Sequence, residues 1–518
     1  MVGHFNVKFL VGDPDGPDGP RGFFRFYRDQ WDEALLGPKP VSDPLDFLEK
    51  DRFGKPLSEK SYGIGGMREY WACLNNPNWR QVLKAWVRCG LARGVDGFIS
   101  NYFYRHDCHC AHCVAAFRLY LRDRFTTDEL ESQFAIHNLA THEFDEIVGW
   151  HDPAQSSPLR REMLRFSQIA NKRAFDEVFI QFGRSLKPDL IVAQWNHLGD
   201  FSQINGDERC LLPDELWGRN EDYLWYSTGG PDKTDLAAGV FGEATLQARY
   251  IRGAFHAKPF TLGKYENVRV RAAIAELLAN GGAPMGFYTD FEDAAARREL
   301  GRYYGFVRRN EMLYRANRSY AEVLLLFPRT SVHQGELAPL ARFKQLGKDL
   351  LDRHILFDVQ PDDLGFQDRP SRSSYRSIIN PADKENVGTE RVETSRATFS
   401  RFKASATVRV SASYPAMGGE LDLHFVNYNR HESANRSASE HGIADENPIP
   451  ASSFEVDLVL PTEGKNRPRA ERLEFLTPER DQPEELEFHQ TNDRVRARVP
   501  EFLVYGVVRI QMRQHPHR

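Results

Sequence analysis

The sequence is poor in cysteine, with 6 in 518 residues. That number is too small for a disulfide scaffold, because small secreted domains that depend on disulfides are rich in cysteine. Three of the six cysteines lie in the stretch CHCAHC at 108–113. Such a cluster of soft ligands indicates metal binding in a reducing compartment.

The sequence also lacks a long apolar run at its start. The first residues, MVGHFNVKFLVGDPDG, hold only a short apolar stretch that ends at Asp13 and Pro14. A signal peptide or a membrane span needs a longer apolar segment, so a strand is predicted here. We therefore expect a cytoplasmic protein without a membrane partner.

Charge of one sign is not in excess: 68 Lys and Arg stand against 73 Asp and Glu, for a formal charge of −5. This balance gives no support to a nucleic-acid partner. With 41% apolar and 27% charged residues, the composition also excludes broad disorder. Aromatic residues make up 12% of the chain, which matters because aromatic side chains line ligand clefts, those for sugars included.

The length predicts about three domains. Up to about residue 310, short apolar runs alternate with helical patterns that stop at glycine, such as NWRQVLKAWVRCGLARG. This alternation indicates an α/β fold with a parallel sheet, and a (β/α)8 TIM-type barrel is the best candidate. Six strands are recognisable, at 5–12, 94–102, 189–196, 222–227, 259–267 and 283–291. Either two more lie within 13–70, or the chain begins part-way into the barrel and lacks its first strands.

The predicted order of domains is a barrel at 1–315, a small α/β domain at 316–366, a linker at 367–400 and a β-sandwich at 401–518. A single strand-helix-strand pattern, from AEVLLLFP to ILFDVQPDD, indicates the small domain. The linker is polar. The segments after it alternate apolar and polar residues with period two, which is typical of antiparallel strands.

The cysteines have the spacing of a metal site. Cys108, Cys110 and Cys113 form a C-x-C-x-x-C run, and Cys73 in YWACLNNPNW is the natural fourth ligand of a tetrahedral zinc. A closed shell of four cysteines leaves no open coordination position, so such a zinc is structural and cannot activate water. Catalysis is then expected elsewhere, without a catalytic cofactor. The alternative is a set of thiols that hold no metal.

Polar and aromatic side chains gather where the predicted strands end. In a barrel these ends meet at one face, where barrel enzymes keep their chemistry. The residues expected to bind substrate there are Asn101, Asn196, His197, Trp195, Trp225, Tyr226, Tyr265 and Tyr288. Four of them, Trp195, Trp225, Tyr226 and Tyr288, are the predicted floor for a stacked sugar ring.

Two segments, YWACLNNPNWRQV and GVDGFISNYFYRHDCHCAHCVAAFRLYLRDRF, resemble glycoside hydrolase family 42, the β-galactosidases. KPFTLGKYEN is similar to that family's seventh strand, APMGFYTDF to its eighth and AEVLLLFPRT to its trimerisation domain. The resemblance implies structural zinc on Cys73 and the C-x-C-x-x-C cluster, a homo-trimer, and a mono- or oligosaccharide substrate. The segment AELLANGGAPMGF is closer to barrel relatives of the family, which include hypothetical glycosyl hydrolases and some α-L-fucosidases.

The resemblance also suggests catalytic residues. Glu266 matches the family's nucleophile, whereas the family's acid/base glutamate is replaced here, because its Asn-Glu pair reads Asn101-Tyr102. Retaining glycosidases need two carboxyls about 5–5.5 Å apart, and inverting ones about 6.5–9.5 Å. Asp290 and Glu243 are the candidate proton donors, and the choice between the two mechanisms stays open.

Three functions are therefore considered. The first is a glycoside hydrolase that cleaves a terminal galactosidic or fucosidic bond, with Glu266 as nucleophile or base. The second is a polysaccharide lyase that performs β-elimination on a uronate-containing saccharide, with Tyr102 as acid, His197 as base and an asparagine that neutralises the carboxylate. The third is a degenerate or truncated barrel that binds sugar without turnover.

Overall fold

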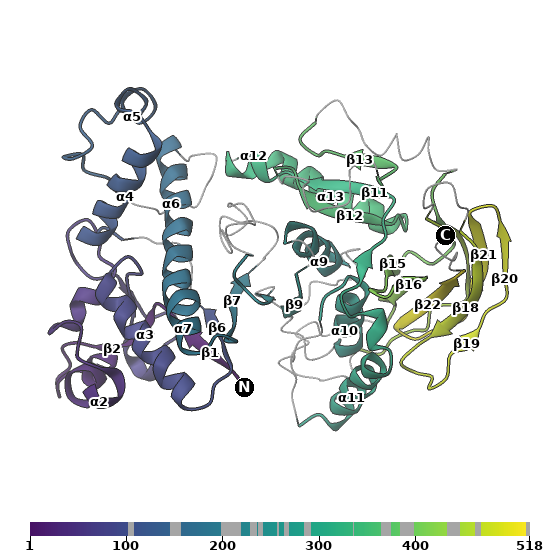
Figure 1. Cartoon of the computed structure of the whole chain (residues 1–518), viewed down its shortest axis with the longest axis horizontal. Helices are drawn as coiled ribbons and strands as arrows, with labels where there is room; N and C mark the ends of the chain where they lie inside the picture. The colour runs from purple at the N-terminus through teal and green to yellow at the C-terminus, as the bar shows by residue number, and fades with distance from the viewer. Residues whose placement is uncertain are drawn as a thin grey trace. The chain divides into compact units, whose positions relative to one another are not determined.

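The computed structural model (Figure 1) describes part of the chain, in ranges that run almost from end to end. The described residues are 1–101, 108–145, 157–197, 219–227, 236, 242–255, 258–263, 269–283, 292–334, 336–363, 374–383, 398–431, 446–461 and 468–513. By its internal contacts the chain divides into two compact units. Unit 1 comprises Met1–Asn196, Ser202–Trp225 and His333–Gly335, and unit 2 comprises His197–Phe201, Tyr226–Val332 and Glu336–Arg518.

Unit 1 is built on a parallel sheet. The strands of this sheet follow one another in chain order: β1 (Val2–Asn6), β6 (Gly97–Asn101), β7 (Ile191–His197), β8 (Leu224–Ser227) and β9 (Phe260–Gly263). The boundary between the units falls within β8. The pairs β1–β6 and β6–β7 are parallel. Strands in this arrangement confirm the predicted α/β class.

Helices cover one face of this sheet. Phe5, Phe98 and Val192 point from the strands into an apolar core with Trp79 and Phe179. Trp79 belongs to α3 (Pro77–Ala92), which begins after the N-cap Asn76 with a proline in its first turn, as helix starts prefer. Phe179 lies in a π-helical continuation (Asp176–Gly183) of α6 (Pro158–Phe175). The other helices of unit 1 are α1 (Phe23–Arg25), α2 (Glu33–Leu36), α4 (Ala111–Arg124), α5 (Thr127–Phe134) and α7 (Arg184–Leu186).

The predicted single strand at 5–12 is wrong, because the chain changes sheets inside it. The Oδ1 of Asn6 accepts hydrogen bonds from the backbone N–H groups of Lys8 (3.3 Å) and Phe9 (2.9 Å), a turn that ends β1. The next strand, β2 (Phe9–Asp13), pairs in a separate antiparallel sheet. Its neighbours are β3 (Arg21–Gly22), β5 (Arg68–Trp71) and β4 (Ser58–Glu59). The described strands between residues 13 and 70 therefore belong to this sheet.

Unit 2 begins with helices and one short strand. These are α9 (Glu243–Ala254), β9 (Phe260–Gly263), α10 (Val270–Ala279) and α11 (Ala294–Arg309). Of the predicted strand at 283–291, only Ala283 is described, and it forms a parallel bridge with Thr261 of β9. A closed (β/α)8 barrel is thus not confirmed by the described strands.

A small parallel sheet follows, in the order β12-β11-β13. Strand β11 (Val323–Phe327) leads through α12 (Arg329–His333) and α13 (Ala338–Asp352) to β12 (Phe357–Pro361), and β13 (Ser377–Ile379) pairs on the other side of β11. The expected strand-helix-strand pattern is present. The domain boundaries drawn from the sequence stay a prediction.

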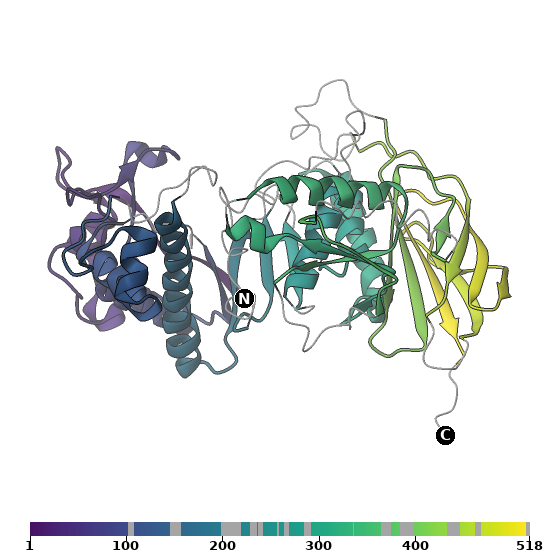
Figure 2. The same cartoon turned by 90° about the horizontal axis from the view of Figure 1, so that it is seen from above.

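The C-terminal strands form two antiparallel sheets, seen in green and yellow in Figure 2. The larger has the order β10 (Arg318–Ser319), β15 (Val408–Tyr414), β16 (Glu420–Asn427), β22 (Tyr505–Met512), β18 (Ala470–Leu476) and β19 (Glu484–Glu485). The smaller has the order β14 (Arg401–Phe402), β17 (Phe454–Val459), β21 (Arg494–Val499) and β20 (Phe488–Thr491). Phe425 and Phe454, one from each sheet, have ring centroids 5.2 Å apart in a shared core, as expected for a sandwich. In the part of the chain that is described, no helix combines the length and apolar content needed to cross a bilayer.

Candidate functional site

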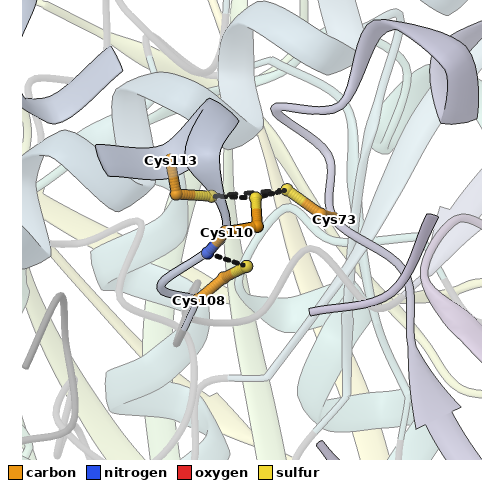
Figure 3. A group of neighbouring side chains, drawn as sticks. All are labelled: Cys73, Cys108, Cys110 and Cys113. Atoms are coloured by element: carbon orange, nitrogen blue, oxygen red, sulfur yellow. Dashed lines mark hydrogen bonds between the residues drawn. The ribbon is translucent and has the colours of Figure 1, made fainter. Parts of the chain in front are cut away.

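Four buried cysteines come together in unit 1, and Figure 3 shows their side chains turned toward one another. Cys73 lies in the turn between β5 and α3, and Asn76 in the same turn begins that helix. Cys110 is the N-cap residue of α4, with Cys108 just before it and Cys113 in the first turn. The four residues predicted from spacing therefore meet in space, and they form the metal-ligating group found among the described residues.

The distances between the sulfur atoms fit one metal ion. Cys73 Sγ lies 3.6 Å from Cys110 Sγ and 3.3 Å from Cys113 Sγ, and the latter two are 3.6 Å apart. A disulfide would need about 2.05 Å, whereas a tetrahedral ion with metal–sulfur bonds of about 2.3 Å places its ligands about 3.8 Å apart. All four ligand atoms lie within 4.8 Å of one another. The group can hold a metal ion, with no coordination position left for water.

Hydrogen bonds to the sulfurs support the same interpretation. The backbone N–H groups of Lys50 and Cys110 each donate to Cys108 Sγ at 3.4 Å, and Asn75 Nδ2 donates to Cys113 Sγ at 3.5 Å. Donors of this kind orient ligands around a metal and stabilise negative sulfur. Burial raises the pKa of the Cys73 thiol, so a cation is what would keep the thiolate in this setting.

A buried ion pair lies next to the cluster, and sequence reasoning missed it. Lys8 Nζ is 2.6 Å from Glu49 Oε1, and the two side chains are only 2% and 3% exposed. Glu49 precedes Lys50, whose carbonyl accepts the N–H of His109 at 2.7 Å. The signal was present in the sequence, as a single lysine within the otherwise apolar run FNVKFLVG.

A row of rings crosses the other face of the parallel sheet of unit 1. Trp195 of β7 has its ring centroid 5.5 Å from that of Trp225 of β8 and 5.4 Å from that of His4 of β1. Both tryptophans are half-buried, and each indole N–H is buried without an acceptor among the described residues. Burial lowers the pKa of His4, which favours its neutral ring. Sequence reasoning found the tryptophans but not His4.

The two predicted asparagines lie on opposite faces. Strand residues alternate between faces, and the register places Asn101 opposite Asn6, on the face of His4. Asn196 follows Trp195 and so faces the other way, where its Nδ2 donates to the carbonyls of Gln194 (3.0 Å) and Trp225 (3.2 Å). Its amide is therefore engaged with the backbone.

The same alternation separates Tyr226 from Trp225. In unit 2, the Tyr226 ring is fully buried and lies 6.3 Å from that of Phe255, centroid to centroid. The remaining predicted residues, Tyr102, Tyr265, Glu266, Tyr288 and Asp290, lie outside the described residues, as do the side chains of His197 and Glu243. Their catalytic and binding roles stay predictions.

No protein-family model and no curated protein matches the chain. Its structure is similar to that of the α-L-fucosidase isoenzyme 2 from Paenibacillus thiaminolyticus, with a TM-score of 0.58 and 13% identity over 93% of this chain and 86% of the other. A cycloisomaltooligosaccharide glucanotransferase from Paenibacillus sp. gives a TM-score of 0.50 and 8% identity, over 98% and 72% of the two chains. A β-galactosidase from Halorubrum lacusprofundi reaches only 0.45, with 16% identity over 63% and 55%.

The first two likenesses show the fold alone, and that fold is shared with enzymes named for their action on saccharides. The third likeness, with a TM-score of 0.45, is too weak to indicate a shared fold. Membership of glycoside hydrolase family 42 is not shown by these findings, so it stays a prediction.

Proposed function

We propose that the protein is a glycoside hydrolase that cleaves a terminal galactosidic or fucosidic bond. The observation that carries this proposal is the row of His4, Trp195 and Trp225 on one face of the parallel sheet, from strands β1, β7 and β8. The faces of aromatic rings such as these offer an apolar surface against which a sugar ring packs. The likeness in fold to an α-L-fucosidase supports the same class of substrate.

In this proposal Glu266 is the nucleophile or the base. It follows strand β9, which ends at Gly263, and strand ends of this kind carry the chemistry of barrel enzymes. Asp290 or Glu243 supplies the proton to the leaving oxygen. The two carboxyls would have to lie about 5–5.5 Å apart for retention or about 6.5–9.5 Å for inversion.

The metal in this proposal is zinc, and its role is structural. The ion would be held by Cys73, Cys108, Cys110 and Cys113, whose sulfur geometry fits a tetrahedral ion. The ion would tie the turn before α3 to the start of α4. The zinc would take no part in bond cleavage.

Hydrolysis of nitrophenyl α-L-fucoside and nitrophenyl β-galactoside tests the function. We expect turnover of at least one substrate and a loss of about 10²–10⁴-fold in kcat for Glu266→Gln, because acid–base or nucleophilic groups contribute on that scale. Trp195→Ala should raise KM by about tenfold, since it removes a stacking surface. Glu487→Gln, an exposed change elsewhere, is the matched control.

Two results would contradict the proposal. If neither glycoside is hydrolysed, the hydrolase assignment is wrong, and a rise in absorbance from unsaturated uronate products would identify the lyase instead. If hydrolysis persists unchanged in Glu266→Gln, that residue is not catalytic. The lyase is the weaker candidate, because Asn196, one of its two expected asparagines, already donates to backbone carbonyls.

A further inference from the structure

Unit 2 contains a cavity of about 220 Å3 that neither the hydrolase proposal nor the metal site uses. It is lined by the last turns of α9 and α10, by β10, by β12 and by β15. At about 30 Å3 for each water molecule, it has room for roughly seven waters or one small organic molecule.

Three arginines face this cavity. Arg249, which is almost fully buried, donates from Nε to Asn280 Oδ1 (3.1 Å) and from Nη1 and Nη2 to the carbonyls of Phe357 (3.0 Å) and Val410 (2.9 Å). Its guanidinium also lies 4.2 Å from the centroid of the Phe357 ring. These acceptors position the group, but all are neutral.

The second and third arginines, Arg252 and Arg318, also contact neutral groups. Arg252 donates from Nη2 to the carbonyl (2.6 Å) and the Oδ1 (2.9 Å) of Asn317, and the exposed Arg318 lies over the Tyr414 ring. Among the described residues, no carboxylate forms an ion pair with Arg249, Arg252 or Arg318. Gly281, at φ +79°, leaves the space for Arg252, because a Cβ there would lie 2.4 Å from its Nη1.

Among the described lining residues there is one carboxylate, that of Asp358. Its two oxygens accept from Ser319 Oγ (2.6 Å) and from the Tyr375 hydroxyl (2.9 Å). Three guanidinium groups against one carboxylate leave the lining with a net charge of +2. Burial lowers the pKa of Arg249 to about 10, because desolvation disfavours its charged form.

We propose that this cavity binds a small molecule that carries an oxyanion, either a phosphate ester or a carboxylate. Guanidinium groups present planar pairs of donors that match these oxyanions, and the ligand would supply the negative charge that the lining lacks. Phe357 and Tyr375 supply apolar surface for the rest of the ligand. The exposed Arg318 gives the cavity a charged side toward solvent.

The site is separate from the proposed catalytic one along the chain. Helix α9 ends at Ala254, and β9 begins at Phe260, so the cavity adjoins the segment that enters this strand. Glu266 follows the opposite end of the strand. Binding at the cavity can therefore be tested independently of glycoside hydrolysis, and either proposal can fail without the other.

Calorimetric titration of the full chain tests the inference with three probes: inorganic phosphate, glucose 6-phosphate and glucuronate. We expect one-to-one binding of at least one probe, and the probe that binds distinguishes phosphate from carboxylate ligands. Sodium chloride at equal ionic strength should give no heat of binding. Arg318→Glu should weaken binding by about tenfold or more, as expected for losing one charge-assisted contact.

The matched control is Arg315→Glu, an exposed change three residues away that alters the net charge equally but does not line the cavity. We expect it to change the affinity by less than about twofold, because an exposed charge outside the site is screened by salt. Asp358→Asn should bind the oxyanion more tightly, since it removes the one negative charge of the lining. The inference is overturned if none of the probes binds at millimolar concentration, or if Arg318→Glu and Arg315→Glu weaken binding equally.

Discussion

His424 is a histidine held neutral in the core of unit 2. Its Nε2 lies 2.9 Å from Ser413 Oγ and its Nδ1 lies 2.8 Å from the Tyr505 hydroxyl, and the ring is fully buried. Both hydroxyls can exchange donor and acceptor roles, so the neutral ring is fully satisfied. Burial lowers the pKa of His424 from 6.5 to about 3, with the positive charge of Arg252 as a lesser cause.

This histidine should make unit 2 less stable in acid. Below pH 6.5 the unfolded chain binds a proton that the folded ring does not bind until about pH 3. The contribution of the neutral His424 ring to the free energy of unfolding is therefore complete above pH 6.5. It falls by about 1.4 kcal/mol for each pH unit below that value. Urea unfolding at pH 7 and pH 5 should show a smaller loss for His424→Gln than for the wild type.

The comparison needs a control, because other groups also titrate. Burial raises the pKa of Asp422, two residues away on the same strand. The contribution of Asp422 to the pH dependence of stability is present in the wild type and the variant alike. The matched control is His489→Gln, at an exposed histidine of the same unit. An identical loss of stability in His424→Gln and the wild type would contradict the assignment.

At the scale of elements, the cysteine cluster joins the turn before α3 to the segment before α4. The turn before α3 donates Cys73 N–H to the Phe47 carbonyl at 2.7 Å, and the segment before α4 donates His109 N–H to the Lys50 carbonyl at 2.7 Å. The metal would thus fasten two loops and the start of a helix. Loss of the metal should therefore destabilise the turn before α3 and the start of α4.

Metal analysis and unfolding of Cys108→Ser test this role. We expect about one metal ion for each wild-type chain and none for the variant. The variant should also lose at least ~3 kcal/mol of its free energy of unfolding, a fraction of the ~10 kcal/mol that structural zinc contributes in small domains. Cys89→Ser is the matched control, because Cys89 lies on α3 outside the cluster. A wild-type protein that carries no metal when purified under reducing conditions would contradict the metal site.

For the whole molecule, the division into two units has a thermodynamic consequence. The cysteine cluster belongs to unit 1, whereas the arginine-lined cavity belongs to unit 2. Compact units with separate cores can unfold separately. Scanning calorimetry should then show two transitions.

Removing the metal or adding an oxyanion should shift the temperature of only one of these two transitions. A chelator should lower only the transition of unit 1, by about 10 °C if ~3 kcal/mol is lost, while a bound oxyanion should raise only that of unit 2 by mass action. The Cys108→Ser variant assigns the first transition independently. A single transition, or equal shifts of both by the chelator, would contradict the expectation.

What the sequence alone determined is what depends on near neighbours along the chain. Strand and helix periods, the C-x-C-x-x-C spacing and the two-residue alternation of the C-terminal strands all follow from local geometry. The sequence also indicated Cys73 as the fourth ligand. The turn at Asn6 was missed, because one side-chain oxygen on two backbone N–H groups leaves no trace in the hydrophobic pattern.

Only the tertiary structure decided which residues face each other. Moving one position along a strand reverses the face, so Trp195 joins the row of rings while Asn196 turns to the backbone. Arg249 and Arg318 are far apart in sequence and meet at one cavity only because two helix ends and three strands pack together. Packing over such distances depends on the whole chain, and for that reason no local pattern predicts it.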